Sequence, residues 1–346
     1  MRSPVSVIVP AYNAESTLGD CLEAVRAAMG PHDELILFDD GSTDNTLTIA
    51  EQAGAQILRN RARPKGPAHA RNTAAGIANR EYLMFVDADV IIHADTIDLL
   101  VSEVEASGAV AAFGSYNDRP RSQRLSSLYA NLRHHFVHHH GSRDAKTFWT
   151  GIGLIDADTF RVFGGYDEVQ FPHPSIEDVE LGMRIVNSGK QIRLVPEAQG
   201  VHCKDWTLRC LWHTDVVRRA LPWSRLVADG KATAPDLNLA RNERFIAAIS
   251  LAIPVAIVGA FFVNYGWLAV IGLIALFLFG IRRFLGLLSK HMNPMQLVLA
   301  AGLHWIYYVY ASVSYASVII ATRLGFRRPA NFAGRPALER TAQPTI

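Results

Sequence analysis

Hydrophobic residues in the first part of the chain form short runs that alternate with amphipathic stretches. The runs have strand length, whereas the stretches between them place apolar residues at helical spacing. The expected strands cover residues 5–9, 34–38, 56–58, 83–86 and 110–115. The expected helices cover residues 16–29, 45–53, 67–77 and 95–107. So regular an alternation predicts an α/β fold with a parallel sheet and crossover helices.

The middle of the chain predicts two more helices and a last strand. Apolar residues at helical spacing indicate a helix over residues 122–140 and another from about 175 to 188. The first ends in five histidines, which we expect to be solvated or to face a membrane rather than to bind a metal. For the second, Ser175 is expected to act as the N-cap, with Asp178 completing a capping box. A last strand is expected over residues 191–196.

Charged residues nearly disappear beyond residue 244. Three apolar runs follow, over residues 245–263, 267–281 and 297–321, and the first contains 19 uncharged residues. Such a run is long enough to cross the roughly 30 Å hydrocarbon core of a bilayer. Buried core helices are the alternative, but three such runs close together favour transmembrane helices.

Basic residues flank the apolar runs and predict their orientation. Arg241 and Arg244 precede the first two runs, and Arg282 follows them, which places the N-terminal part in the cytoplasm. Three crossings would put the basic tail around Arg323 on the opposite side, against the same rule. Either one run is re-entrant or interfacial, or the tail is an exception.

Composition limits the remaining choices. The net charge of +2 over 346 residues gives no broad surface for polyanions, so nucleic acid is not an expected partner. The apolar run over residues 5–9 is too short for a secretory signal and is closed by Pro10. The three cysteines are odd in number and have no framework spacing, which favours reduced thiols in the cytosol.

Two carboxylates follow the apolar run over residues 83–86. In an extended chain, Asp87 and Asp89 point to the same side. Two acids side by side repel each other unless a cation or a proton lies between them. At the carboxyl end of a strand, where open α/β folds bind ligands, such oxygens suit Mg²⁺ or Mn²⁺. We expect a metal site here, with a solvated strand end as the alternative.

The same tripeptide, Asp-Ala-Asp, recurs at Asp156 and Asp158. This second pair precedes a short helical stretch that stops at Gly164. Acids in that position are typical of helix N-caps, so capping is the expected role of the second pair.

Five motifs in order along the chain resemble those of the family 2 glycosyltransferases, which have the GT-A fold. They are Val-Ile-Val-Pro-Ala-Tyr-Asn at 7–13, Asp-Asp-Gly-Ser-Thr-Asp at 39–44, Ala-Arg-Asn at 70–72, Asp-Ala-Asp at 87–89 and Glu-Asp-Val-Glu-Leu at 177–181. The resemblance covers about residues 5–223. It implies a GT-A domain over 1–224, an interfacial linker over 225–244, two or three transmembrane helices over 245–322 and a basic, disordered tail over 323–346.

The resemblance also implies roles for single residues. The nucleotide-sugar site would be lined by Pro10, Ala11, Tyr12, Asp39, Asp40, Arg71, Asp87 and Glu177. Among these, Asp39, with Asp40, would bind the base, usually uracil, and Arg71 would lie near the base and diphosphate.

The resemblance further implies how the reaction would proceed. Asp87 and Asp89 would bind the metal ion, Mg²⁺ or Mn²⁺, with His202 as a further ligand. Asp178 would be the catalytic base of an inverting reaction that needs no covalent nucleophile.

The resemblance predicts a metal-dependent enzyme of cell-envelope synthesis at the cytoplasmic face of the inner membrane. It would move one sugar from a nucleotide-sugar donor, a UDP-sugar, to a hydroxyl of a lipid or lipid-linked acceptor. The Gln-x-x-Arg-Trp motif of processive relatives is absent from the sequence, which favours single transfer.

Three other functions are considered. A polyprenyl-phosphate glycosyltransferase would attack with a phosphate oxygen, and a non-catalytic membrane scaffold would use the fold alone. A nucleotide-binding oxidoreductase is disfavoured because no Gly-x-Gly-x-x-Gly follows the first strand.

Overall fold

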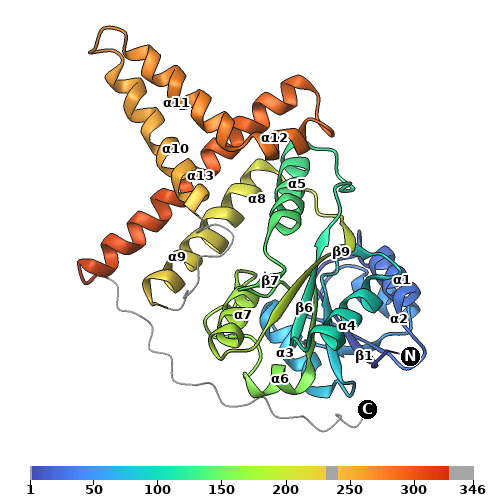
Figure 1. Cartoon of the computed structure of the whole chain (residues 1–346). Helices are drawn as coiled ribbons and strands as arrows, with labels where there is room; N and C mark the ends of the chain where they lie inside the picture. The colour runs from blue at the N-terminus through green and yellow to red at the C-terminus, as the bar shows by residue number, and fades with distance from the viewer. Residues whose placement is uncertain (1, 231–240, 327–346) are drawn as a thin grey trace. The chain divides into compact units, whose positions relative to one another are not determined.

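The computed structural model describes residues 2–230 and 241–326, which divide into two compact units (Figure 1). The first unit contains residues 2–122 and 138–204, and the second contains 123–137, 205–230 and 241–326. Residues 231–240 of the predicted linker and 327–346 of the predicted tail lie outside the described residues.

The first unit is built on a nine-stranded mixed sheet. Its strand order is β3 (Gln56–Arg59), β2 (Glu34–Asp39), β1 (Val5–Ala11), β4 (Tyr82–Val86), β8 (Ile152–Asp156), β6 (Ala111–Tyr116), β9 (Ile192–His202) and β5 (Val90–Ile92), with β7 (Asp144–Ala145) paired to β9. The first four strands in this order are parallel, as predicted. Beyond them the sheet is mixed: β6 and β9 are parallel, but the prediction is wrong at β8, which is antiparallel to both of its neighbours.

The connection from β6 to β8 leaves the first unit. The two strands are joined through α5 (Leu125–His140), most of which belongs to the second unit. A parallel pair would need a crossover that packs back on the sheet. Strand β9 is also longer than the predicted strand over residues 191–196, since β6 and β5 pair with its second half.

Helices cover both faces of the sheet. They are α1 (Leu18–Ala28), α2 (Thr46–Gln52), α3 (Pro67–Ile77), α4 (Thr96–Ser107), α6 (Ala157–Val162) and α7 (Glu177–Asn187). Alternate residues of the central strands face opposite sides, as the period of a strand requires. Met84 of β4 packs in the cluster with α1 and α4, whereas Phe85 packs in the cluster with α3, α6 and α7.

The second unit is helical. Besides most of α5, it contains α8 (Leu208–His213), the π-helix η1 (Thr214–Ala220), α9 (Leu221–Ala228), α10 (Arg241–Gly259), α11 (Gly266–Gly280), α12 (Arg282–Leu288) and α13 (Pro294–Arg323). By length and hydropathy, α10 and α13 could each cross a membrane. Helices α11 and α12 pass the same test only together and are bent by 66° at the break between them.

The histidine-rich end of α5 differs from its prediction. His139 and His140 are exposed, but His138 is buried, and its ring lies 5.6 Å from that of Phe113 and 4.8 Å from that of Trp149. The expectation of a wholly solvated or membrane-facing tract is therefore wrong at His138, which packs among aromatic rings.

Candidate active site

The predicted site residues gather where β1, β2 and β4 end. Ala11 is paired with Asp39 across β1 and β2, and Ile8 of β1 is paired with Phe85 of β4. Because parallel strands end at one edge of the sheet, Pro10, Ala11, Asp39 and Asp87 share that edge. Tyr12, directly after β1, is 52% exposed.

Arg71 joins three elements at this edge. It is buried in α3, with Nη2 2.6 Å from Oδ1 of Asp87 and Nη1 3.0 Å from Oε1 of Glu177. Burial lowers the pKa of Arg71, but the two carboxylates outweigh that effect and raise it above its ordinary value. Burial raises the pKa of Asp87, and the neighbouring Arg71 cancels only part of that increase. A permanent cation thus holds two acids together.

Asp89 has a different partner. Its Oδ2 lies 3.5 Å from Nε2 of His202, at the end of β9, and the His202 ring stacks on Tyr116 with centroids 4.2 Å apart. Burial raises the pKa of Asp89, but His202 and Lys204 outweigh burial, so this pKa lies below its ordinary value. Within residues 2–230 and 241–326, no three or more His, Cys, Asp or Glu side chains are grouped to hold a metal ion.

Asp178 stands in the first turn of α7 and is held by Thr150. Its Oδ2 accepts hydrogen bonds from the backbone N–H and the hydroxyl of Thr150, both at 3.1 Å. Its Oδ1 accepts the N–H of Val179 at 2.8 Å. No role for Thr150 was predicted, because nothing in the local pattern around residue 150 indicates a partner on α7.

The predicted cap of α7 is wrong. The helix begins at Glu177, and Ile176, whose side chain makes no capping hydrogen bond, is at the N-cap position in place of Ser175. Ser175 instead donates its backbone N–H to Oε2 of Glu177 at 2.8 Å. The reason is that the Glu177 side chain reaches between Arg71 and the chain before the helix.

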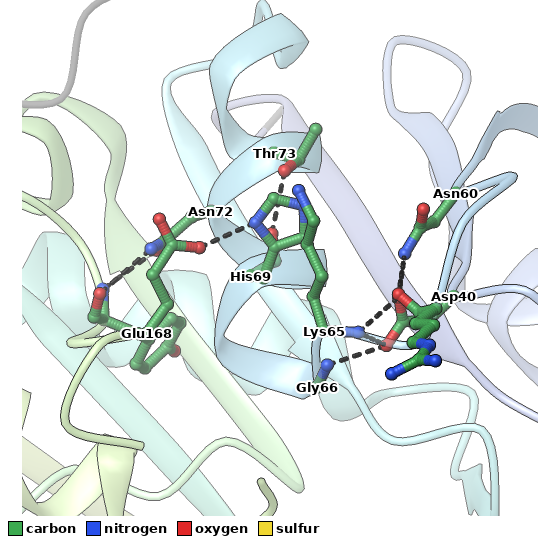
Figure 2. Close-up of polar contacts among 10 residues, drawn as sticks. Asp40, Asn60, Lys65, Gly66, His69, Asn72, Thr73 and Glu168 are labelled. Atoms are coloured by element: carbon green, nitrogen blue, oxygen red, sulfur yellow. Dashed lines mark hydrogen bonds and ion pairs between the residues drawn. The ribbon is translucent and has the colours of Figure 1, made fainter. Parts of the chain in front are cut away.

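The two acids at the end of β2 have nearby partners, although Oδ2 of Asp39 accepts no hydrogen bond among the described residues. Oδ1 of Asp39 accepts the N–H of Ser42 at 2.9 Å, and its Oδ2 lies 3.1 Å from Nε of Arg59. Asp40 accepts the backbone N–H groups of Lys65 and Gly66 at 2.9 and 2.7 Å (Figure 2). Asp40 therefore fixes the loop from which α3, and with it Arg71, begins.

Gly66 is required at the start of α3. Its φ is +93°, which side chains rarely adopt, and an added Cβ would lie 2.4 Å from the carbonyl oxygen of Pro172. The tight approach brings the chain before α7 against the start of α3.

Helix α3 also holds the chain that leads to α7. Asn72 donates to the carbonyl of Tyr166 and accepts its N–H, both at 2.9 Å, and Nδ1 of His69 lies 2.7 Å from Oε2 of Glu168 (Figure 2). The sequence motif contained Asn72 but gave it no role. Together with Arg71, these contacts tie Asp178 and its helix to the edge that carries Asp87.

An aromatic pair that was not predicted completes the site. The half-buried Trp149 lies edge-on to Tyr116, with ring centroids 4.7 Å apart. The benzene part of its indole covers Gly151, where an added Cβ would lie 2.4 Å from the ring. Gly151 accepts the backbone N–H of Asp87 at 3.4 Å, so Trp149 lies next to the strand end.

The second Asp-Ala-Asp has the predicted capping role. Asp156 is the N-cap of α6, and its Oδ1 accepts the N–H of Thr159 at 2.6 Å. The side chain of Asp158 is 82% exposed, and its Oδ1 lies 3.1 Å from Nη1 of Arg161, three residues further along the chain.

Comparison with known proteins identifies the family. The model described as glycosyl transferase family 2 matches residues 6–163. Glycosyltransferase GlyG of Streptococcus pneumoniae serotype 4 is 34% identical over 120 residues, which cover 34% of this chain and 40% of GlyG. The Escherichia coli UDP-Glc:alpha-D-GlcNAc-diphosphoundecaprenol beta-1,3-glucosyltransferase WfgD is 33% identical over 114 residues, covering 32% of this chain and 45% of WfgD. The chain therefore spans less than half the length of these relatives.

Solved structures share the fold. Mannosyltransferase PcManGT from Pyrobaculum calidifontis, in complex with GDP-Man and Mn²⁺, aligns with a TM-score of 0.54 and 16% identity over 91% of this chain and 88% of PcManGT. S. aureus TarS 1–349 in complex with UDP-GlcNAc aligns with a TM-score of 0.51 and 19% identity over 93% of this chain and 92% of TarS 1–349. Residues 6–163 carry a glycosyl transferase family 2 domain, and the fold is GT-A.

Proposed function

We propose that this protein is an inverting glycosyltransferase of cell-envelope synthesis. It moves one sugar from a nucleotide-diphosphate donor, a UDP-sugar, to a hydroxyl of a lipid or lipid-linked acceptor at the cytoplasmic face of the membrane. The observation that carries the proposal is the side-chain network at the edge of the sheet. In it, Arg71 joins Asp87 to Glu177. The next residue on α7, Asp178, is held by Thr150.

The donor site would lie on the Asp87 side of this network. Pro10, Ala11, Tyr12 and Asp39 would line the nucleotide, while Asp40 keeps the loop before α3 in place. The guanidinium of Arg71 supplies positive charge beside the diphosphate. In support, PcManGT was solved with GDP-Man and Mn²⁺, and TarS with UDP-GlcNAc.

The residues present fit a divalent ion of the Mg²⁺ or Mn²⁺ type. Asp87 and Asp89 offer carboxylate oxygens on one stretch of chain, and Nε2 of His202 faces Asp89. Such ions are held by one or two carboxylates together with substrate phosphates, so a larger protein cage is not needed. When bound, the ion would neutralise charge on the leaving diphosphate.

Asp178 would be the base. Its carboxylate takes the proton of the acceptor hydroxyl while that oxygen bonds to the anomeric carbon. The bond from this carbon to the diphosphate breaks on the opposite face, so the configuration inverts. Thr150 holds the carboxylate by two hydrogen bonds to one oxygen. This arrangement leaves the direction of the carboxylate fixed before the acceptor binds.

The lipid nature of the acceptor rests on the second unit. Helices α10 and α13 are apolar enough to cross a membrane, which suggests membrane association. The relative WfgD is named for a diphosphoundecaprenol-linked acceptor and a UDP-Glc donor. We infer an acceptor of this chemical class, a sugar or alcohol hydroxyl carried by a lipid.

The test is release of nucleotide by the purified full chain, in lipid extract, from a panel of UDP- and GDP-sugars. Parallel reactions would contain Mn²⁺, EDTA, or the Asp89→Asn variant. Release from one donor that needs both the ion and Asp89 is expected. If no donor is cleaved and none binds, the fold serves a non-catalytic role and the proposal fails.

A further inference from the structure

Helix α13 has the length and hydropathy of a membrane span, but its neighbours are charged. It packs along η1 and α9, which continue α8 as one helical stretch over residues 208–228 (Figure 1). The charged residues of that stretch are Arg209, Asp215, Arg218, Arg219 and Arg225. A helix with so many charges is costly to place in the hydrocarbon core of a bilayer.

A buried ion pair lies against the middle of α13. Arg133 of α5 donates to both carboxylate oxygens of Asp215 in η1 at 2.8 Å, and both side chains are buried. The hydroxyl of Tyr310 on α13 donates to Asp215 Oδ2 at 2.5 Å. The Arg133 guanidinium also lies 4.3 Å from the centre of the Tyr307 ring. The middle of α13 thus contacts a buried pair of charged side chains.

The α10–α11 pair has the opposite character. Beyond residue 254 it exposes Val255, Val258, Phe261, Phe262 and Val263, each at least 61%. The end of α11 lies beside the first part of α10, as shown by the 2.9 Å that would separate an added Cβ on Gly280 from the Ile246 side chain. This hairpin has the apolar, unpartnered surface expected of a segment inserted in lipid.

Helix α13 meets this hairpin at its base. The indole N–H of Trp305 donates to the carbonyl of Ser250 at 3.1 Å, and the Tyr308 hydroxyl donates to Glu243 at 2.6 Å. Glu243 is in the first turn of α10 and Ser250 is at its middle, so both precede the exposed apolar part beyond residue 254. The middle of α13 therefore lies against the N-terminal half of α10.

The outer face of α13 carries an apolar stripe. Leu299, Ile306, Val313 and Ile320 follow one another every seven residues, and each is 45–55% exposed. Seven residues are close to two helical turns, so the four side chains share one face, over roughly 31 Å. Buried residues of the same helix, among them Ala300, His304, Tyr308 and Val318, face the protein.

We propose that α13 does not cross the bilayer but lies in the plane of its interface, with the stripe among the lipid acyl chains. The hairpin α10–α11 inserts beside it, and the charged helix over 208–228 stays on the aqueous side. The lipid surface is the partner because α13, which carries the stripe, packs directly on the apolar hairpin through Trp305 and Tyr308. An interfacial helix buries its apolar face by about 5–10 Å.

The proposal resolves the conflict in the charge pattern. A hairpin that returns, followed by an in-plane helix, brings Arg323 at the end of α13 back to the side of the basic residue Arg244. Both then obey the positive-inside rule. The inference does not depend on the reaction proposed above.

Depth measurement with spin labels tests the proposal. Leu299→Cys, Ile306→Cys, Val313→Cys and Ile320→Cys would be labelled one at a time in the full chain. Each would carry Cys210→Ser, since Cys21 and Cys203 are buried. In nanodiscs of phosphatidylethanolamine and phosphatidylglycerol, all four labels are expected at one depth, about 5–10 Å below the phosphates. The matched control, Phe262→Cys at the hairpin tip, is expected to lie deeper.

Two outcomes would overturn the proposal. A graded series, with one label near the bilayer centre at about 15 Å depth, would show that α13 crosses the membrane. Four labels accessible to an aqueous nickel chelate would show that the stripe does not meet lipid. As a second readout, fluorescent-protein or alkaline-phosphatase fusions to each end should report the same side, and opposite sides would contradict the proposal.

Discussion

The tripeptide Asp-Ala-Asp occurs twice in the first unit, with unlike surroundings. It follows β4 at Asp87 and Asp89, and it spans the end of β8 at Asp156 and Asp158. Because β4 and β8 are antiparallel neighbours, with Tyr82 opposite Asp156, the two copies lie at opposite edges of the sheet. Only the first copy shares its edge with the ends of β1 and β2. Strand direction, rather than the local sequence, determines which copy can meet the residues of other motifs.

The partners of the two copies differ accordingly. Asp87 is bonded to the buried Arg71, and Asp89 faces His202, both from distant segments. Asp156 and Asp158 bond to residues three positions further along the same helix. Long-range partners fix a carboxylate in a site, whereas local partners stabilise a helix end.

The largest expected effect separates the two copies directly. Asp89→Asn keeps the size of the side chain but removes its charge, and we expect kcat to fall by about 10⁴-fold, or about 5.5 kcal/mol of lost transition-state stabilisation. Asp158→Asn is the matched control and should retain full activity. Nucleotide release at saturating donor and Mn²⁺ measures both. Equal losses in the two variants would mean that the edges are not functionally distinct.

Asp178→Asn is expected to lower kcat by about 10³-fold, within the usual range for loss of a general base. The donor KM should stay unchanged, because the proposed base acts on the acceptor. The measurement is a kcat and KM determination with lipid extract as acceptor. Activity that survives would instead indicate an acceptor that is already ionised, a polyprenyl phosphate.

Much of this edge could be predicted from sequence because its signals are local. The runs that became β1 to β4, and the acids at residues 87 and 89, follow from alternation and spacing within a few residues. The direction of β8 could not be predicted, since it depends on how strands far apart in sequence pair. The missed contacts are equally non-local: Arg71 and Glu177 are 106 positions apart, and Thr150 and Asp178 are 28.

A smaller effect tests how the base is held. Thr150→Val removes the hydroxyl that donates to Asp178 and leaves the backbone N–H in place. A hydrogen bond to a charged group contributes about 1.5–3 kcal/mol, so kcat should fall by about 10- to 100-fold. Thr150→Ser keeps the hydroxyl and should restore most of the activity. If kcat is unchanged and only the donor KM rises, Thr150 acts on donor binding rather than on Asp178.

The smallest effect concerns the second copy and should appear in stability alone. Asp156→Ala removes the oxygen that accepts the N–H of Thr159 at the start of α6. Loss of an N-cap costs about 1 kcal/mol, which lowers the melting temperature of a unit of this size by about 2–4 °C. Activity per folded molecule should not change, since α6 begins at the edge opposite Asp87.

Asp158→Ala should leave the melting temperature almost unchanged, because its exposed pair with Arg161 contributes little. A thermal melt followed by tryptophan fluorescence, with kcat measured on the same samples, distinguishes the two roles. Loss of kcat in Asp156→Ala without loss of stability would place this acid in a site, and the contrast between the two copies would not hold.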